Sequence, residues 1–404
     1  MIPPGNPYRA ILRRDYPEPL IALLALILGI WVWDHYFSKD VGYAPGTELV
    51  ALVKIDRDLR LADAMAADPG WLKWLAGVDE PAEVLKDAHE VLAMLAADES
   101  ISSQGLEAFA SLEAEHVGRS VQQAHGQSGS SLRARAVIAR SAVWSLGLVG
   151  LVFIPSALRS LKNGFLERPR GYGGAWSLPL GLVVFLVATL AWIGFTTTLN
   201  MGIQTLPGLH PAAAILFDSA ARLLPPLIAL GLLFKRPSHA ARVMGLARQI
   251  EVKAVLGVFS LLMIVDQILR LAMGESGSNS PGGGLSLAES GLWGLAFALV
   301  SACLLAPVAE EIIYRGVLFR ACRNRLGVMS AALASSAMFA LLHFYDGYGL
   351  VSVAIFGFSC ALLYAGTSSL TTVIALHMLY NSAIKIPEWI VYHAPLGGPG
   401  NALF

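Results

Sequence analysis

Two adjacent glutamates and an arginine interrupt an apolar stretch in the last third of the chain. In "AEEIIYRG", residues 309–316, Glu310, Glu311 and Arg315 follow mainly Leu, Ala and Val. Ionisable groups at bilayer depth cost about 2.5–3.5 kcal/mol each on insertion scales, so they must contact one another or water. On a helix Glu311 and Arg315 share one face and can pair, whereas Glu310 is rotated by about 100°. One carboxylate is therefore held by a cation and the other is left for chemistry. Pro307 has no N–H and is expected to loosen the backbone before Glu310.

Two later apolar segments carry polar residues that could meet Glu310. "FALLH" places Phe339 four residues before His343, and "HMLYN" places His377 four residues before Asn381, so each pair shares a helical face. At about 1.5 Å per residue from the expected cytoplasmic ends, Glu310 lies near 20 Å, His343 near 21 Å and His377 near 12 Å. Imidazole and carboxamide N–H groups are donors, and a desolvated carboxylate can accept a proton. A common acid–base site is therefore geometrically possible.

The three motifs together resemble a known family. "EEIIYR", "FALLH" and "HMLYN" are similar, in order and in consecutive apolar segments, to the EExxxR, FxxxH and HxxxN motifs of the CPBP (Abi) intramembrane proteases. That family includes the CAAX prenyl endopeptidases. The resemblance covers about residues 285–390. It implies an intramembrane endopeptidase that hydrolyses a peptide bond near the terminus of a membrane-attached protein or peptide.

The resemblance also implies a role for each polar side chain. Glu310 and His343 would hold and deprotonate the attacking water. His377 and Asn381 would donate hydrogen bonds to the tetrahedral oxyanion, and the ion pair of the first motif would support the helix and the local charge balance. No metal or other cofactor is expected.

Three alternatives remain open at this stage. Two His and one Glu also form a catalytic zinc set, which would make the protein a metal-dependent protease. A transporter could relay protons or ions through Glu310, His343 and Asp266. A non-catalytic scaffold could bind a peptide through residues 39–137. Asp266 and Arg270 form a second pair four residues apart, which is expected to be structural.

The composition indicates the elements that must position these residues. The chain has 404 residues, is 55% hydrophobic and is only 14% charged, against roughly 25% charged residues in a soluble domain. We expect an all-α polytopic membrane protein with about nine transmembrane helices and a helical soluble insert, because a helix needs roughly 20 apolar residues to span the bilayer. The expected spans are 18–37, 138–157, 176–198, 211–234, 254–273, 289–315, 328–344, 349–366 and 369–386.

Loop charges predict the orientation and the division of the chain. Basic residues concentrate ahead of the first span and in loops 158–171, 235–253 and 320–325, which favours a cytoplasmic N-terminus in a multi-pass cell-membrane protein, with a bacterial inner membrane as the expected location. The expected partners are the lipid bilayer and a membrane-attached substrate, and no nucleic acid. The expected parts are an arm with the first helix at 1–38, an acidic extracytoplasmic insert at 39–137, membrane helices at 138–284, a catalytic core at 285–390 and a tail at 391–404.

Overall fold

Every regular element in the described part of the chain is a helix. The computed structural model describes residues 18–37, 61–62, 64–78, 127–166, 176–204, 211–273, 291–345 and 347–392. The chain divides into two compact units. Unit 1 comprises Met1–Tyr36, Leu146–Asn279 and Phe297–Ser382, and unit 2 comprises Phe37–Ser145, Ser280–Ala296 and Ala383–Phe404. The expected all-α class is confirmed.

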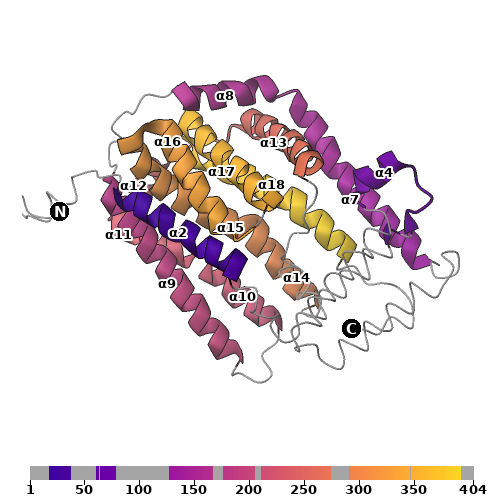
Figure 1. The fold of residues 1–404 in the computed structure, drawn as a ribbon, viewed down its shortest axis with the longest axis horizontal. Helices are drawn as coiled ribbons and strands as arrows, with labels where there is room; N and C mark the ends of the chain where they lie inside the picture. Colours follow the sequence, from indigo (N-terminus) through magenta and orange to yellow (C-terminus); the bar gives the residue numbers. More distant parts are fainter. Residues whose placement is uncertain are drawn as a thin grey trace, which may run out of the picture. The chain divides into compact units, whose positions relative to one another are not determined.

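Unit 1 contains most of the long apolar helices (Figure 1). The helices that lie wholly or partly in it are α2 (Glu18–Phe37), α7 (Gln127–Leu151), α8 (Ile154–Leu166), α9 (Leu178–Gln204), α10 (Pro211–Ala221), α11 (Leu224–Leu233), α12 (Pro237–Met244), α13 (Val252–Met273), α14 (Gly291–Val300), α15 (Ala306–Glu311), α16 (Arg320–Leu341), α17 (Gly347–Thr367) and α18 (Leu370–Tyr392). Two π-helical stretches, η2 (Ser301–Leu305) and η3 (Ile312–Phe319), flank α15.

Six stretches of the described chain are long and apolar enough to cross a membrane. They are Leu132–Leu151, Leu178–Leu199, Ile215–Leu233, Val252–Met273, Ala296–Arg323 and Gly347–Thr367. The protein is therefore a multi-pass membrane protein. The other three expected spans correspond to the shorter apolar helices Glu18–Trp33 and Arg325–Leu341 and to α18.

Prolines break two of the expected spans. The stretch expected at 138–157 ends as α7 at Leu151, and α8 begins at Ile154 with Pro155 in its first turn. The stretch expected at 211–234 divides into α10 and α11 just before Pro225. Proline fits the first helical turn, where no N–H is needed, but it cannot continue the ladder of a preceding helix.

Helix α17 is held at very short range by α8. A Cβ added to Gly164 of α8 would lie 2.1 Å from the carbonyl oxygen of Leu362, and one added to Gly366 of α17 would lie 2.0 Å from that of Ser160. Small residues permit this backbone contact inside a membrane. Figure 1 shows α17 flanked by α16 on one side and by α8 and α13 on the other.

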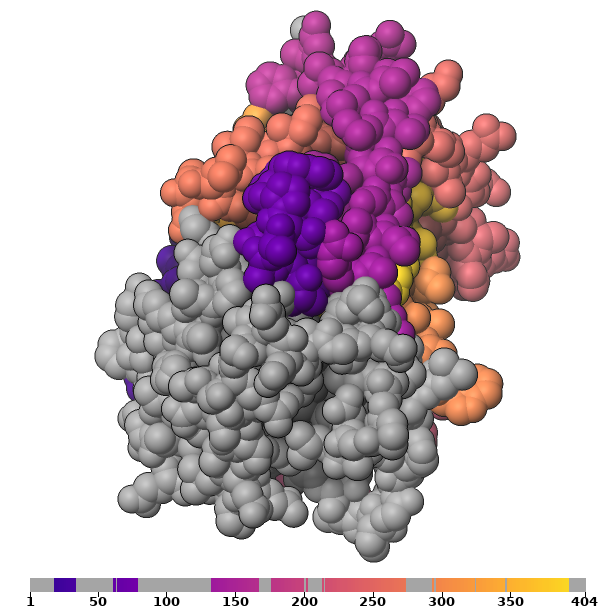
Figure 2. All heavy atoms as spheres, turned by 90° about the vertical axis from the view of Figure 1, so that its right-hand side faces the viewer, coloured from indigo at the N-terminus to yellow at the C-terminus, as the bar shows by residue number. Residues whose placement is uncertain are grey.

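The described part of the insert expected at 39–137 comprises residues 61–62 and 64–78, which include the short helix α4 (Gly70–Ala76), and the beginning of α7 at 127–137. Helix α4 packs on α7 within unit 2 (Figure 2). The Trp74 and Trp144 rings lie 4.9 Å apart between centroids. The Asp68 carboxylate accepts two hydrogen bonds from Arg133, at 2.5 and 2.6 Å. These bonds lower the pKa of Asp68 below its ordinary value. Most of the insert, most of the tail expected at 391–404 and the loop at 274–290 lie outside the described residues.

Candidate active site

The helix that carries the two glutamates is irregular on both sides of them. The N–H of Ala306 donates to the carbonyl of Ser301, five residues back, as in a π-helix. Pro307 has no N–H, so it cannot donate to the carbonyl of Ala302 in the same pattern. The side-chain Nδ2 of Asn381 donates to that carbonyl instead, at 2.9 Å. Pro307 thus interrupts the backbone hydrogen bonding before Glu310, as the sequence predicts. Asn381 supplies the donor that the Ala302 carbonyl would otherwise lack.

Glu311 and Arg315 form the expected ion pair at the centre of unit 1. Both side chains are 0% exposed, and Arg315 Nη1 donates to Glu311 Oε1 at 2.8 Å. Arg315 Nη2 donates to the carbonyl of Gly357 on α17 at 3.0 Å. The guanidinium also lies over the Phe339 ring, 4.6 Å from its centroid, a favourable cation–π arrangement. The arginine therefore connects η3, α16 and α17.

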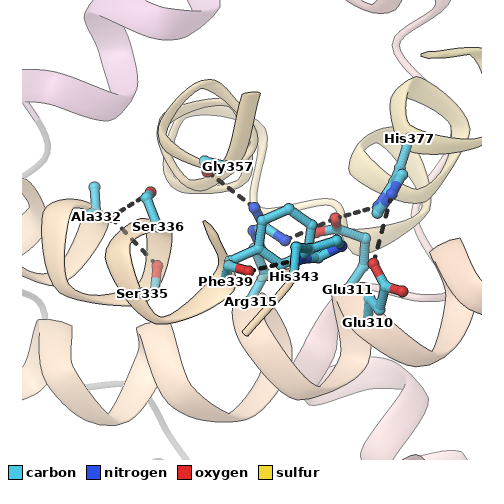
Figure 3. Close-up of polar contacts among 10 residues, drawn as sticks. All are labelled: Glu310, Glu311, Arg315, Ala332, Ser335, Ser336, Phe339, His343, Gly357 and His377. Carbon is cyan, nitrogen blue, oxygen red and sulfur yellow. Dashed lines mark hydrogen bonds and ion pairs between the residues drawn. The ribbon is translucent and has the colours of Figure 1, made fainter. Parts of the chain in front are cut away.

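His377 joins the two glutamates (Figure 3). Its Nδ1 lies 2.7 Å from the same Glu311 Oε1 that Arg315 contacts, and its Nε2 lies 3.7 Å from Glu310 Oε2. Because a carboxylate only accepts hydrogen bonds, Nδ1 carries a proton when Glu311 is ionised. The sequence predicted the ion pair of Glu311 but not this second contact, which fixes the imidazole orientation.

The two glutamates differ in exposure as well as in partners. The Glu310 side chain is 24% exposed, whereas that of Glu311 is fully buried. Glu311 is occupied by a cation and an imidazole, whereas Glu310 faces the other edge of the same imidazole. The carboxylate of Glu310 is thus accessible to a small molecule and lies beside a ring nitrogen whose direction is fixed. Proton transfer to and from water requires groups placed in this way.

His343 lies in the turn that follows α16 and is held by the last part of that helix. Its Nδ1 lies 2.6 Å from the carbonyl oxygen of Phe339. Since a carbonyl can only accept, Nδ1 carries the proton and a neutral ring presents Nε2 as an acceptor. The His343 ring lies 4.5 Å from the Phe339 ring, and the His377 ring lies 5.9 Å from it, between centroids. The structure thus places both histidines and Arg315 around one phenylalanine.

Two aromatic residues complete the surroundings of His377. Phe339 contacts the guanidinium of Arg315 and both imidazole rings. Phe356 of α17 lies 4.8 Å from the His377 ring with its edge toward it, and sequence reasoning missed it because an apolar residue in an apolar span gives no signal.

Asn381 was expected to aim at one point with His377, but its Nδ2 is directed to the backbone of η2, because Pro307 leaves a carbonyl there to be satisfied.

The side chains also bear on the zinc alternative. A catalytic zinc needs three protein ligands around one ion. In the described part of the chain no three His, Cys, Asp or Glu residues are grouped in this way. The nitrogen of His377 that is closest to a carboxylate already contacts Glu311, which leaves only Nε2 as a ligand atom.

The fold and the site define a class: a multi-pass helical membrane protein in which two glutamates of α15 and a histidine of α18 are in contact inside the helix bundle. Residues 292–383, which contain all of these side chains, match the family described as Type II CAAX prenyl endopeptidase Rce1-like. This match supports the resemblance of the segment to the CPBP family that the three motifs indicated.

One curated relative agrees with this assignment. The chain is similar to "Putative membrane peptidase YdiL" of Bacillus subtilis (strain 168), with 31% identity over 90 residues. The similarity covers 22% of this chain and 36% of the relative, so the chain matches about a third of that protein's length. No solved structure matches the chain at a significant level.

Proposed function

We propose that this protein is a membrane endopeptidase of the CAAX prenyl type, which hydrolyses a peptide bond near the terminus of a membrane-attached protein or peptide. One observation carries the proposal: within the Rce1-like segment, the accessible carboxylate of Glu310 faces the Nε2 edge of an imidazole whose Nδ1 edge is fixed by buried Glu311. Hydrolysis of an amide needs a base for water and donors for the oxyanion, and both kinds of group are present.

In the proposed mechanism Glu310 and His343 hold the attacking water, and Glu310 takes its proton. The water oxygen then bonds to the scissile carbonyl carbon, and the carbonyl oxygen becomes the oxyanion. Glu310 returns the proton to the leaving nitrogen as the C–N bond breaks. The two protonation states of one carboxylate therefore serve both halves of the reaction.

His377 and Asn381 act as the oxyanion donors in this proposal. The Nδ1 proton of His377 is engaged by Glu311, so donation from Nε2 in this proposal requires a ring with a proton on both nitrogens. Arg315 offsets the charge of Glu311. Asn381 has a second amide hydrogen beyond the one given to Ala302. Removing one such donor typically costs about 10²–10³ in rate.

The test uses the full chain, purified and reconstituted in lipid nanodiscs. The first probe is an internally quenched peptide that ends in a farnesylated cysteine and three further residues, and the second is a reporter carrying a C-terminal transmembrane anchor. We expect cleavage of one of the two, and we expect Glu310→Gln to abolish it. The matched control is Asp218→Asn, which changes a carboxylate of another candidate span and is expected to leave cleavage intact.

The same assay decides the competing chemistry. Cleavage is expected to persist in excess chelator, whereas loss that zinc restores would assign a metal-dependent protease. Wild-type cleavage by the Glu310→Gln protein would overturn the proposed mechanism. If neither probe is cut, comparison of protein termini between wild-type and deletion strains identifies the substrate, and the absence of any change in length would overturn the proposed activity.

A further inference from the structure

A second polar cluster lies in unit 1, on the other side of α17 from Arg315. Asp266 of α13 accepts hydrogen bonds on Oδ1 from the hydroxyl groups of Tyr348 and Ser352 on α17, the latter at 3.1 Å. Its Oδ2 lies 3.3 Å from Nε of Arg270, one turn along α13, and the same Nε lies 3.1 Å from the Tyr348 hydroxyl. Both oxygens of the carboxylate are therefore satisfied.

This cluster connects a helix outside the family segment to helices inside it. Asp266 lies in the candidate span Val252–Met273, whereas Tyr348 and Ser352 lie in the matched segment 292–383. A carboxylate in a membrane span is unfavourable unless it serves a partner. The sequence predicted the pair with Arg270, but that pair alone does not account for the two hydroxyl groups that α17 contributes.

A series of contacts leads from Asp266 to His377. The hydroxyl groups of Ser352 and Tyr380 lie 3.5 Å apart, between α17 and α18. The Tyr380 ring stacks on Phe356 with centroids 4.7 Å apart and planes at 25°. Phe356 in turn presents its ring to His377 at 4.8 Å. Tyr380 also lies one helical turn beyond His377 on α18, so the backbone supports the same connection.

We propose that Asp266 is a positioning residue for His377. It holds Ser352 and Tyr348, and through them the register of α17 against α13. Ser352 and the stacked Tyr380 then fix the Phe356 ring against which the imidazole rests. The catalytic consequence rests on the proposed function, whereas the placement of the imidazole does not.

We expect substitutions of Asp266 to have graded effects on the position of His377. Asp266→Leu removes the acceptor for both hydroxyl groups and frees Phe356 to shift. Asp266→Asn retains an acceptor oxygen and a similar shape, so it should rescue most of the effect. Ser260→Ala is the matched control, because Ser260 is a buried polar residue of the same helix that donates to the carbonyl of Gly147 at 2.6 Å. It carries no connection to His377.

The experiment records the ¹³C–¹H signals of labelled histidines in the full chain in nanodiscs. The chain has nine histidines, and the signal of His377 is the one missing from His377→Gln. We expect Asp266→Leu to move this signal by more than its linewidth and to lower kcat by about 10- to 100-fold, as for a catalytic group displaced by about 1 Å. KM should change less than kcat. Asp266→Asn should remain within about threefold of wild type, by the same reasoning.

Two results would overturn the proposal. One is a His377 signal in Asp266→Leu that matches wild type, whatever the activity, because the role would then be structural only. The other is a shift of the His377 signal in Ser260→Ala that is as large as the shift in Asp266→Leu. If Asp266→Leu does not fold, Ser352→Ala replaces it with the same expectation. Retained cleavage by Glu310→Gln would instead overturn the proposed mechanism, and the absence of any cleaved substrate would overturn the proposed function. In either case the histidine measurement still decides the placement of His377.

Discussion

Removal of the Glu311 carboxylate tests whether the ion pair supports the folded protein. In Glu311→Ala the guanidinium of Arg315, 0% exposed, loses its counter-ion; among the described residues it keeps the Gly357 carbonyl and the Phe339 ring. Breaking a buried pair by deleting one partner typically costs about 3–5 kcal/mol, because an uncompensated charge stays buried. His377 also loses the acceptor of its Nδ1 proton. We therefore expect a loss of stability at the upper end of that range.

The matched control is a more exposed Asp–Arg pair at the same spacing in another candidate span. Asp218 and Arg222 are 3.5 Å apart, with side chains 46% and 36% exposed. Exposed pairs contribute roughly 0–1 kcal/mol, so Asp218→Ala should change stability by less than 1 kcal/mol on that estimate.

The assay is reversible unfolding of the full chain in mixed detergent micelles. The double variant Glu311→Leu with Arg315→Met should recover much of the loss, since replacing a whole buried pair by apolar residues is often neutral. Equal effects of Glu311→Ala and Asp218→Ala would refute the argument that burial makes the first pair costly to break.

Three further outcomes follow from the contacts. Asn381→Ala should destabilise the protein in thermal unfolding by about 1–3 kcal/mol, because it leaves the partly buried carbonyl of Ala302 unsatisfied; Pro307→Ala, which restores a backbone N–H, should reduce that loss, and additive effects would contradict the coupling. Gly357→Ala should lower thermal stability and activity, since its Cβ would lie 3.2 Å from the arginine that its carbonyl binds; a wild-type melting curve would disprove this. Because Arg133 lowers the pKa of Asp68, the pair contributes stability above the ordinary carboxyl pKa of about 3.9 that is lost as the pH falls through the lowered value. Hydrogen exchange of the following helix should show this acid sensitivity, and Asp68→Asn should remove it.

The sequence predicted the parts of the site that depend on helical spacing. The pairing of Glu311 with Arg315 and the different direction of Glu310 follow from residues four and five positions apart on one helix. The double use of Glu311 could not be predicted, because His377 comes from a helix 66 residues away in the chain. The partner of Asn381 is the backbone carbonyl of Ala302 in a π-helical stretch. Pro307 was the sequence feature that indicated an unsatisfied carbonyl at this point.

The fold was predictable to a similar extent. Apolar length identified the helical stretches, because the bilayer sets the minimum length of a span. The break between α7 and α8 was missed although Pro155 marks it, because hydropathy averages over a window and does not register a single missing N–H. The order of helices around α17 depends on backbone contact at Gly164 and Gly366, which hydropathy does not encode.

The contact between α8 and α17 connects the candidate active site to a helix that contributes none of its side chains. Gly366 lies nine residues from Gly357, roughly 13 Å along the same helix at 1.5 Å per residue. A methyl group at Gly164 or Gly366 would have to displace a main-chain oxygen of the opposite helix, and α17 would transmit that displacement to the carbonyl that anchors the buried guanidinium. Inactivating changes at these two glycines would thus mimic loss of a catalytic group, even though neither position touches the reacting atoms.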